Sequence, residues 1–394
     1  MRSPTPRRPV PLRRAALLLA GALLALPTLA QESVKIGYSG PLSGGAAQYG
    51  KNVLDGMKMA VDEINAAGLK VGGKPVSLEI VALDDKYMPS ETAINEQRLV
   101  QEYKAPVVLC PHSGGGFAIQ TSNEQQNVLL LSYTSVPQIT ARGNKLTFRI
   151  PPEFTGYIPA FIKYTMGRYG KKVGIADADH EYAKAWNAAF KPAWEAAGGS
   201  IVADNPMSYN RSTDFYSGVS KVLAAQPDVL FVGGASEPTG LVIKQARELG
   251  FKGGFILIDQ AKMDEVAKVA GGYAALEGSI GVLPLNEDSS AQARGFVDRF
   301  HKLYPGRDPT YETSLNYTAL WATAGAMALA GSTSDGAAIR AQLDKAIKAL
   351  APEHNPNGAS GIDERGGSVT NALRVAVVEQ GKVKEMPLAS LSGK

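Results

Sequence analysis

Three sets of residues have the types that catalysis or metal binding requires, yet none of the sets is complete. Residues 45–52, GAAQYGKN, nearly match the phosphate-binding pattern GxxxxGK[ST], but Asn52 replaces the hydroxyl that would bind Mg²⁺. No histidine lies at a metal-ligand spacing from another histidine or cysteine, and no serine lies in a GxSxG elbow. We therefore predict neither an enzyme nor a bound metal or cofactor.

The segment around Ser113 suggests binding instead of catalysis. Ser113 is followed by glycines at 114–116 and stands between an apolar strand and a helical pattern. Backbone N–H groups at a helix N-terminus favour an anion, glycine permits close approach, and a serine hydroxyl suits a carboxylate. From this segment alone, a carboxylate site and a flexible turn are equal alternatives. We interpret His112 as a spectator near this loop and Cys110, the only cysteine, as a buried structural thiol.

Short β-rich runs alternate with helical patterns along the first part of the chain, up to about residue 150. We predict strands at 34–38, 76–83, 107–110 and 128–132, and helices at 47–67, 90–103 and from about 116. Ser90 is the predicted N-cap of the second helix.

The alternation then restarts. We predict strands at 172–176, 201–203, 229–232, 255–258, 372–378 and 382–385, and helices at 158–169, 183–197, 215–225, 240–249, 291–303, 315–330 and 337–349. Such alternation predicts an α/β fold with parallel sheets covered by helices on both faces, and the two series indicate two similar lobes. Ligands bind beyond the carboxyl ends of such strands, so the loops there form the candidate site.

The first thirty residues have the three-part plan of a secretory signal peptide. An apolar run at 15–26 is preceded by five arginines, and the first thirty residues contain no acidic residue. The segment Thr28-Leu29-Ala30 then supplies the small residues that a signal peptidase recognises. The run is shorter than the roughly 20 residues that span a membrane. These five arginines belong to the leader, so the rest of the chain has 36 basic and 37 acidic residues. This nearly neutral balance does not favour binding to nucleic acid. We expect export to the periplasm.

The N-terminal part of the chain resembles a known family. The stretches IGYSGPLSG at 36–44, QYG at 48–50 and AVDEINAAG at 60–68 resemble the opening of periplasmic leucine/isoleucine/valine-binding proteins. These are the substrate-binding proteins of branched-chain amino acid ABC transporters. The resemblance implies a type I periplasmic binding fold, in which two doubly wound parallel-sheet lobes are joined by three hinge crossovers. It places lobe 1 at 31–149 and 282–360, and lobe 2 at 150–281 and 361–394.

The resemblance also implies a set of ligand contacts. In lobe 1, Ser113 matches the serine that takes the ligand carboxylate, Thr134 and Ser135 fall in the next strand-end loop, and Tyr49 matches an aromatic residue over the ligand. In lobe 2, Tyr182 matches a tyrosine at a helix start, and Asp259 matches a carboxylate that pairs with the ligand ammonium.

Two positions depart from the family pattern and leave alternatives open. Ala235 and Ser236 stand where an aromatic contact is usual, which weakens the case for an ordinary branched-chain ligand. Asp259 is shorter than the usual glutamate, so Gln260 is an alternative contact.

The resemblance therefore implies a monomeric solute-binding protein of an ABC importer, which takes a small carboxylate-bearing ligand, an aliphatic or branched-chain amino acid, to inner-membrane permease subunits. The alternatives are an aromatic carboxylate or an amide as ligand, or a periplasmic sensor that regulates a signalling partner.

The leader generates a prediction about processing. Protein released from its native host by osmotic shock should begin at or near Gln31, because cleavage after Ala30 fits the small-residue rule. Intact mass spectrometry checks this. A mass that retains residues 1–30 in the native host would contradict export.

Overall fold

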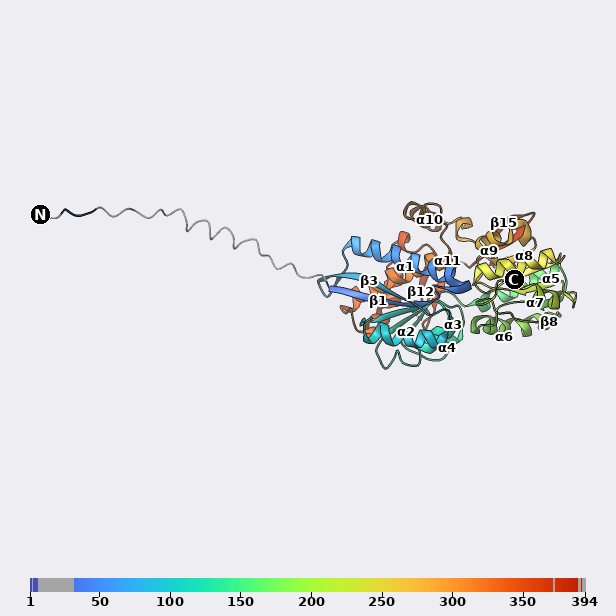
Figure 1. Cartoon of the computed structure of the whole chain (residues 1–394), viewed down its shortest axis with the longest axis horizontal. Coiled ribbons are helices and arrows are strands. Elements are labelled where there is room, and N and C mark those ends of the chain that lie inside the picture. Colours follow the sequence, from blue (N-terminus) through green and yellow to red (C-terminus); the bar gives the residue numbers. More distant parts are fainter. Residues whose placement is uncertain (2, 6–31, 371–372, 389–390, 392–394) are drawn as a thin grey trace.

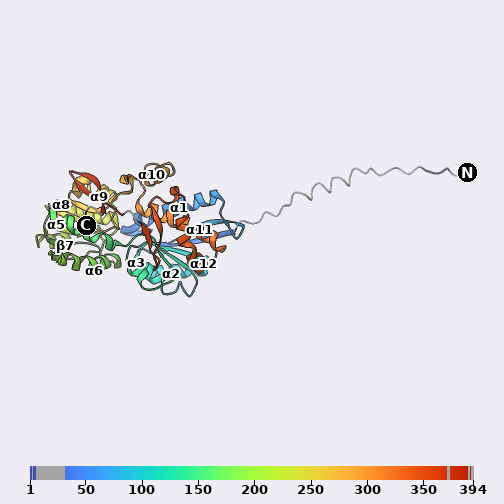
Figure 2. The ribbon, with the colours of Figure 1, turned by 180° about the vertical axis from the view of Figure 1, so that it is seen from behind.

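Two parallel-stranded sheets organise the chain, and they lie in two units placed side by side in both views (Figures 1 and 2). The computed structural model describes residues 1, 3–5, 32–370, 373–388 and 391. The predicted signal peptide at 1–30 therefore falls outside the described residues, apart from residues 1 and 3–5.

The first sheet has the strand order β2-β3-β1-β4-β5-β6, and its strands run parallel except for the β2–β3 pair. Its strands are β1 Glu32–Gly40, β2 Lys70–Val71, β3 Lys74–Asp84, β4 Val107–Cys110, β5 Leu129–Ser132 and β6 Thr147–Arg149. The strands β4 and β5 are buried on both faces, which explains their continuous apolar sequences VVLC and LLLS.

The second sheet has the order β15-β14-β11-β10-β9-β7-β8, with an antiparallel edge formed by β14 and β15. Its strands are β7 Lys172–Ile175, β8 Ser200–Asp204, β9 Val229–Val232, β10 Gly254–Leu257, β11 Ser279–Val282, β14 Arg374–Glu379 and β15 Lys382–Pro387. A separate hairpin joins β12 Ala359–Ile362 to β13 Ser368–Thr370.

Helices cover both sheets. Those packed on the first sheet are α1 Ala47–Ala67, α2 Pro89–Gln101, α3 Ser113–Ile119, α4 Gln138–Ala141, α10 Ala291–Leu303, α11 Tyr311–Ala330 and α12 Gly336–Lys348. Those packed on the second are α5 Ile158–Arg168, α6 Glu181–Ala196, α7 Tyr216–Leu223, α8 Ser236–Glu248 and α9 Met263–Ala270. No helix in the described part of the chain is both long enough and apolar enough to cross a membrane.

The chain passes between the two units three times: after β6, after β11, and between β13 and β14. Helices α10–α12 pack on the core of the first sheet, whereas β14 and β15 extend the second sheet. The predicted α/β fold with two similar parallel sheets is confirmed. The lobe limits at residues 149, 281 and 360 stay a proposal.

Several local predictions differ from the structure. Helix α2 begins at Pro89 with Met88 as its N-cap, because proline fits the first turn of a helix; Ser90 is not the cap. Helix α3 begins at Ser113, not near 116. The sequence analysis also left 259–290 without an element, yet α9 and β11 lie there.

Helix α1 approaches α11 closely at Gly56. A methyl group built at Gly56 would lie 2.0 Å from the backbone oxygen of Thr313, which real contacts do not allow. The two helices can therefore pack at this distance only because residue 56 has no side chain. Gly295 in α10 is a contrasting case, because nothing lies within 4 Å of a methyl group built there.

These two glycines give a matched prediction. Gly56→Ala should lower the free energy of unfolding by about 1–3 kcal/mol, because it overpacks a rigid contact. Gly295→Ala should leave stability unchanged or raise it by about 0.5–1 kcal/mol, because alanine favours the helix. Urea unfolding followed by circular dichroism measures both. Equal stability of the two variants would show that α1 and α11 can separate freely.

Candidate functional site

The predicted site residues come from loops at the carboxyl ends of strands in both sheets. Parallel strands place these ends along one edge, so each sheet presents its loops together. The loops after β1, β4 and β5 supply one side, and those after β7 and β10 supply the other. They carry Tyr49, Ser113, Thr134 and Ser135 on the first side, and Tyr182 and Asp259 on the second.

Asp259 is the point at which the two sides meet. Ser135 Oγ, from the first side, donates to Asp259 Oδ2 at 2.7 Å. The Tyr182 hydroxyl and Trp186 Nε1, both from α6, donate to Oδ1, the latter at 3.0 Å. A carboxylate offers about four acceptor positions, so these three bonds leave Asp259 able to accept from one further N–H group.

Gln260, the alternative contact, has a different partner. Its Nε2 donates to the Tyr87 hydroxyl at 2.8 Å, which also joins the two sides of the cleft. Asp259 and Gln260 both line a small cavity of about 30 Å³ between the units. The structure thus places both side chains at the cleft, and it assigns the contact with Ser135 and Tyr182 to Asp259.

The same small cavity has five of the six predicted residues in its wall; Ser113 is the exception. Ser113 is 1% exposed, and its hydroxyl forms a 3.0 Å hydrogen bond with the Thr134 hydroxyl. Ser113 is also the first residue of helix α3, and His112 is the N-cap of that helix. Ser113 therefore lies behind Thr134, in contact with the cavity wall. The wall is completed by Tyr87, Pro111, His112, Tyr133, Pro151, Gln260 and Lys262.

Tyr87 is a site residue that the sequence analysis missed. Its ring stacks between the imidazoles of His112, at 4.6 Å, and His180, at 5.1 Å, and these histidines belong to opposite sides of the cleft. Both histidines are also helix N-caps: Nδ1 of His112 accepts from Gly115 N–H, and Nδ1 of His180 accepts from Ala183 N–H. The two caps therefore fix the rings that enclose Tyr87. Its left-handed backbone, with φ of 63°, has no periodic signature in the sequence.

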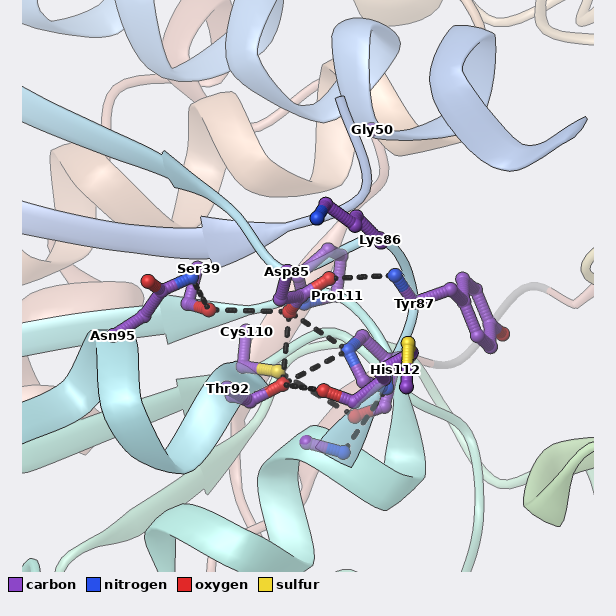
Figure 3. Close-up of polar contacts among 12 residues, drawn as sticks. Ser39, Gly50, Asp85, Lys86, Tyr87, Thr92, Asn95, Cys110, Pro111 and His112 are labelled. Atoms are coloured by element: carbon purple, nitrogen blue, oxygen red, sulfur yellow. Dashed lines mark hydrogen bonds and ion pairs between the residues drawn. The ribbon is translucent and has the colours of Figure 1, made fainter. Parts of the chain in front are cut away.

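A buried network behind Tyr87 holds this side of the cleft in place (Figure 3). The Asp85 carboxylate accepts bonds from Ser39 Oγ at 3.1 Å, Thr92 Oγ1 at 2.9 Å and the Tyr87 N–H at 2.9 Å. Its fourth partner is His112 Nε2 at 2.9 Å, which must carry the proton because Nδ1 is an acceptor. Asp85 is fully buried, and these four donors compensate its charge.

Asp85, Cys110 and His112 are close enough together to be considered as metal ligands. Both nitrogens of His112, however, already have partners in the protein, and Asp85 accepts four bonds. Cys110 is buried, as predicted, and its thiol faces the backbone oxygen of His112 at 3.6 Å. The arrangement is that of a structural hydrogen-bond network, and it leaves His112 no nitrogen for an ion.

A second link between the two units is a buried ion pair. Lys262 Nζ lies 2.9 Å from Glu312 Oε1, and their side chains are 5% and 1% exposed. Lys262 follows β10, whereas Glu312 lies in the first turn of α11. Burial raises the pKa of the Glu312 carboxyl, and the Lys262 ammonium opposes that shift. No sequence pattern indicates this pair, because it joins residues of different units that are far apart in the sequence.

Two α/β units that present paired polar groups across a cleft define a two-lobed ligand-binding protein. Residues 33–382 match the model of the periplasmic binding protein family, so the chain belongs to this family. The stated resemblance to leucine/isoleucine/valine-binding proteins is confirmed. The family consists of binding proteins and not of enzymes.

Individual relatives agree with this assignment. A leucine-, isoleucine-, valine-, threonine- and alanine-binding protein of Pseudomonas aeruginosa is 27% identical over 357 residues, which cover 89% of this chain and 91% of the relative. The leucine-binding protein LivK of Thermotoga maritima is 26% identical, with a TM-score of 0.73 over 90% of this chain and 97% of that one.

Two further solved structures show the fold alone. One is LivJ of Streptococcus pneumoniae, a branched-chain amino acid transporter substrate-binding protein in complex with isoleucine. It is 24% identical and has a TM-score of 0.75, and the match covers 90% of this chain and 99% of LivJ. A solute-binding protein of an ABC transporter from R. palustris, in complex with benzoate, has a TM-score of 0.75 at 20% identity over 90% and 96%. The predicted type I periplasmic binding fold is confirmed.

His180 gives the site a predictable pH dependence. Burial lowers the pKa of its imidazole to about 4, whereas the pKa of a histidine in the unfolded chain is about 6.5. The folded state therefore binds fewer protons, and His180 destabilises the protein as the pH falls from about 6.5 to 4. We expect a loss of roughly 1–3 kcal/mol, because one unit of pKa shift corresponds to about 1.4 kcal/mol.

Urea unfolding at pH 7.5 and 4.5 measures the effect. His180→Asn keeps an N-cap acceptor but cannot titrate, so its stability should fall less with acid than that of the wild type. His301→Asn, at an exposed position in α10, is the matched control and should behave as the wild type does. The same acid sensitivity in all three proteins would rule out His180 as its source.

Proposed function

We propose that this protein is the periplasmic ligand-binding component of an ABC importer, and that it binds an aliphatic amino acid between its two lobes. It acts as a monomer and presents the ligand to inner-membrane permease subunits. The ligand contacts are Tyr49, Ser113, Thr134, Ser135, Tyr182 and Asp259. Export through the predicted leader places the protein in the periplasm.

The observation that carries this proposal is the position of Asp259, which bonds Tyr182 on its own side of the cleft and Ser135 on the opposite side. An acidic group that retains an acceptor position suits an ammonium, because a charge-assisted bond is stronger than a neutral one. The hydroxyls of Ser113 and Thr134, next to the N-terminal turn of α3, suit a carboxylate. An α-amino acid carries both an ammonium and a carboxylate group.

The placement of contacts on both units supports a closing mechanism. A ligand shifts an open–closed equilibrium only when it binds the two states with different affinity. A small ligand held by Asp259 from one unit and Thr134 from the other makes its full set of contacts only in the closed state. The relatives whose names specify leucine, isoleucine and valine are consistent with such a ligand.

An aromatic carboxylate is the second candidate ligand. The small residue Ala235 stands where the family resemblance expects an aromatic side chain, which favours a ligand bulkier than a branched-chain amino acid. The benzoate complex in the same fold shows that the architecture can accommodate such an acid. An aromatic acid has no ammonium, so Asp259 distinguishes the two candidates.

Asp259→Asn should therefore weaken leucine binding roughly ten- to 150-fold, because one charged hydrogen bond contributes about 1.5–3 kcal/mol. It should leave benzoate binding unchanged or improved. Titration calorimetry of ligand-free protein with both compounds makes the measurement. Asp298→Asn, at an exposed position in α10, is the matched control and should bind as the wild type does. A wild-type protein that binds benzoate and not leucine would replace the amino-acid proposal with the aromatic-acid one.

A further inference from the structure

A larger cavity adjoins the small one on the side of the three chain crossovers. It has a volume of about 410 Å³, which is within the range of small-molecule sites. Its wall includes Pro152 from the first crossover, Val282 from the second and Arg374 from the third. We call it the crossover cavity. It shares Tyr133, Pro151, Asp259 and Lys262 with the small cavity, so these four residues separate the two spaces.

The crossover cavity contains polar groups that lack partners. Tyr133 and Tyr157 are 7% and 5% exposed, yet their hydroxyls form no hydrogen bond with any residue that the structure describes. The side-chain oxygen and nitrogen of Asn357 are buried and also unpartnered within the described chain. Tyr311, in the same wall, shows the usual situation, because its hydroxyl donates to Asp288 at 3.0 Å. Asn357 is thus buried without a partner, and the two tyrosine hydroxyls have none in the described chain, so the wall offers hydrogen-bonding groups to a ligand.

The charged groups in the described wall, in contrast, are all paired. Lys262 is bound to Glu312, and Arg374 is bound to Asp288 at 3.0 Å. Asp259 accepts three hydrogen bonds from the protein. The remaining wall is rich in aromatic, proline and leucine side chains. This lining suits an uncharged, ring-sized group that carries a hydrogen-bonding atom.

We propose that the crossover cavity receives the side chain of the ligand, and that the preferred ligand is an aromatic α-amino acid with a polar ring, such as tyrosine or tryptophan. This inference rests on the proposed function, because the amino and carboxyl groups stay at the small cavity. The ring lies beyond Tyr133 and exchanges hydrogen bonds with the hydroxyls of Tyr133 and Tyr157. A leucine side chain has no hydrogen-bonding atom to offer these hydroxyls.

Four probes with one head group and different side chains test the inference: leucine, phenylalanine, tyrosine and tryptophan. In calorimetric titrations, tyrosine and tryptophan should bind at least tenfold more tightly than leucine. Leu315→Trp, in the wall of the cavity, should abolish this advantage by filling the space, so that tyrosine and tryptophan bind no more tightly than leucine. Leu329→Trp is the matched control, because Leu329 lies on the same helix at an exposed position.

Tyr157→Phe tests the hydrogen bond separately from the space. It should weaken tyrosine binding about fivefold and leave phenylalanine and leucine unchanged, since only tyrosine offers the hydroxyl group. If leucine binds as tightly as tyrosine and tryptophan, and Leu315→Trp changes none of them, the ligand does not enter the crossover cavity and the proposed function still stands. If none of the four amino acids binds, the proposed function fails and this inference fails with it.

Discussion

Removing charged groups from water is costly unless each of them finds a partner, and this constraint shapes the cleft between the two units. Lys262 and Glu312 come from different units and are almost completely buried, so their ion pair requires the two units to be together. Asp259 likewise accepts bonds from both sides of the cleft. Separation of the units would expose these charged groups to water, and hydration would then replace the ion pair and the hydrogen bonds. A ligand that binds the closed arrangement more tightly would shift the balance between the two arrangements.

The cleft can act in this way because its walls are rigid. On the first side, Asp85 binds Ser39, Thr92, His112 and the backbone of Tyr87 in one buried network. The histidine caps of α3 and α6 then fix the two rings that enclose Tyr87. Farther from the cleft, the contact of α1 with α11 at Gly56 holds together segments distant in the sequence. Each unit is thus held together by contacts of its own, and three crossovers connect the two units.

The sequence predicts well what depends on local pattern and poorly what depends on contacts between loops. Helix α1 has the predicted bounds, because its apolar positions repeat at helical spacing and Gly68 ends it with a φ of 75°. Strand β4 is also as predicted, since a strand buried on both faces has a continuous apolar sequence. Strand β11 was missed, because its burial between β10 and β14 is not visible in four residues. The family resemblance indicated Asp259 and Ser135, and the structure places them within hydrogen-bond distance. No local signal indicated Tyr87, Tyr133 or the partner of Lys262.

The central claim is that a ligand closes the two lobes through Asp259, and small-angle X-ray scattering of wild-type and Asp259→Asn protein across a leucine titration tests it most directly. The account predicts that the radius of gyration of the wild type falls to a lower plateau, and that the variant stays expanded at the leucine concentrations that saturate the wild type. A radius that does not change in the wild type while calorimetry shows leucine bound, or that falls equally in both proteins, would contradict it.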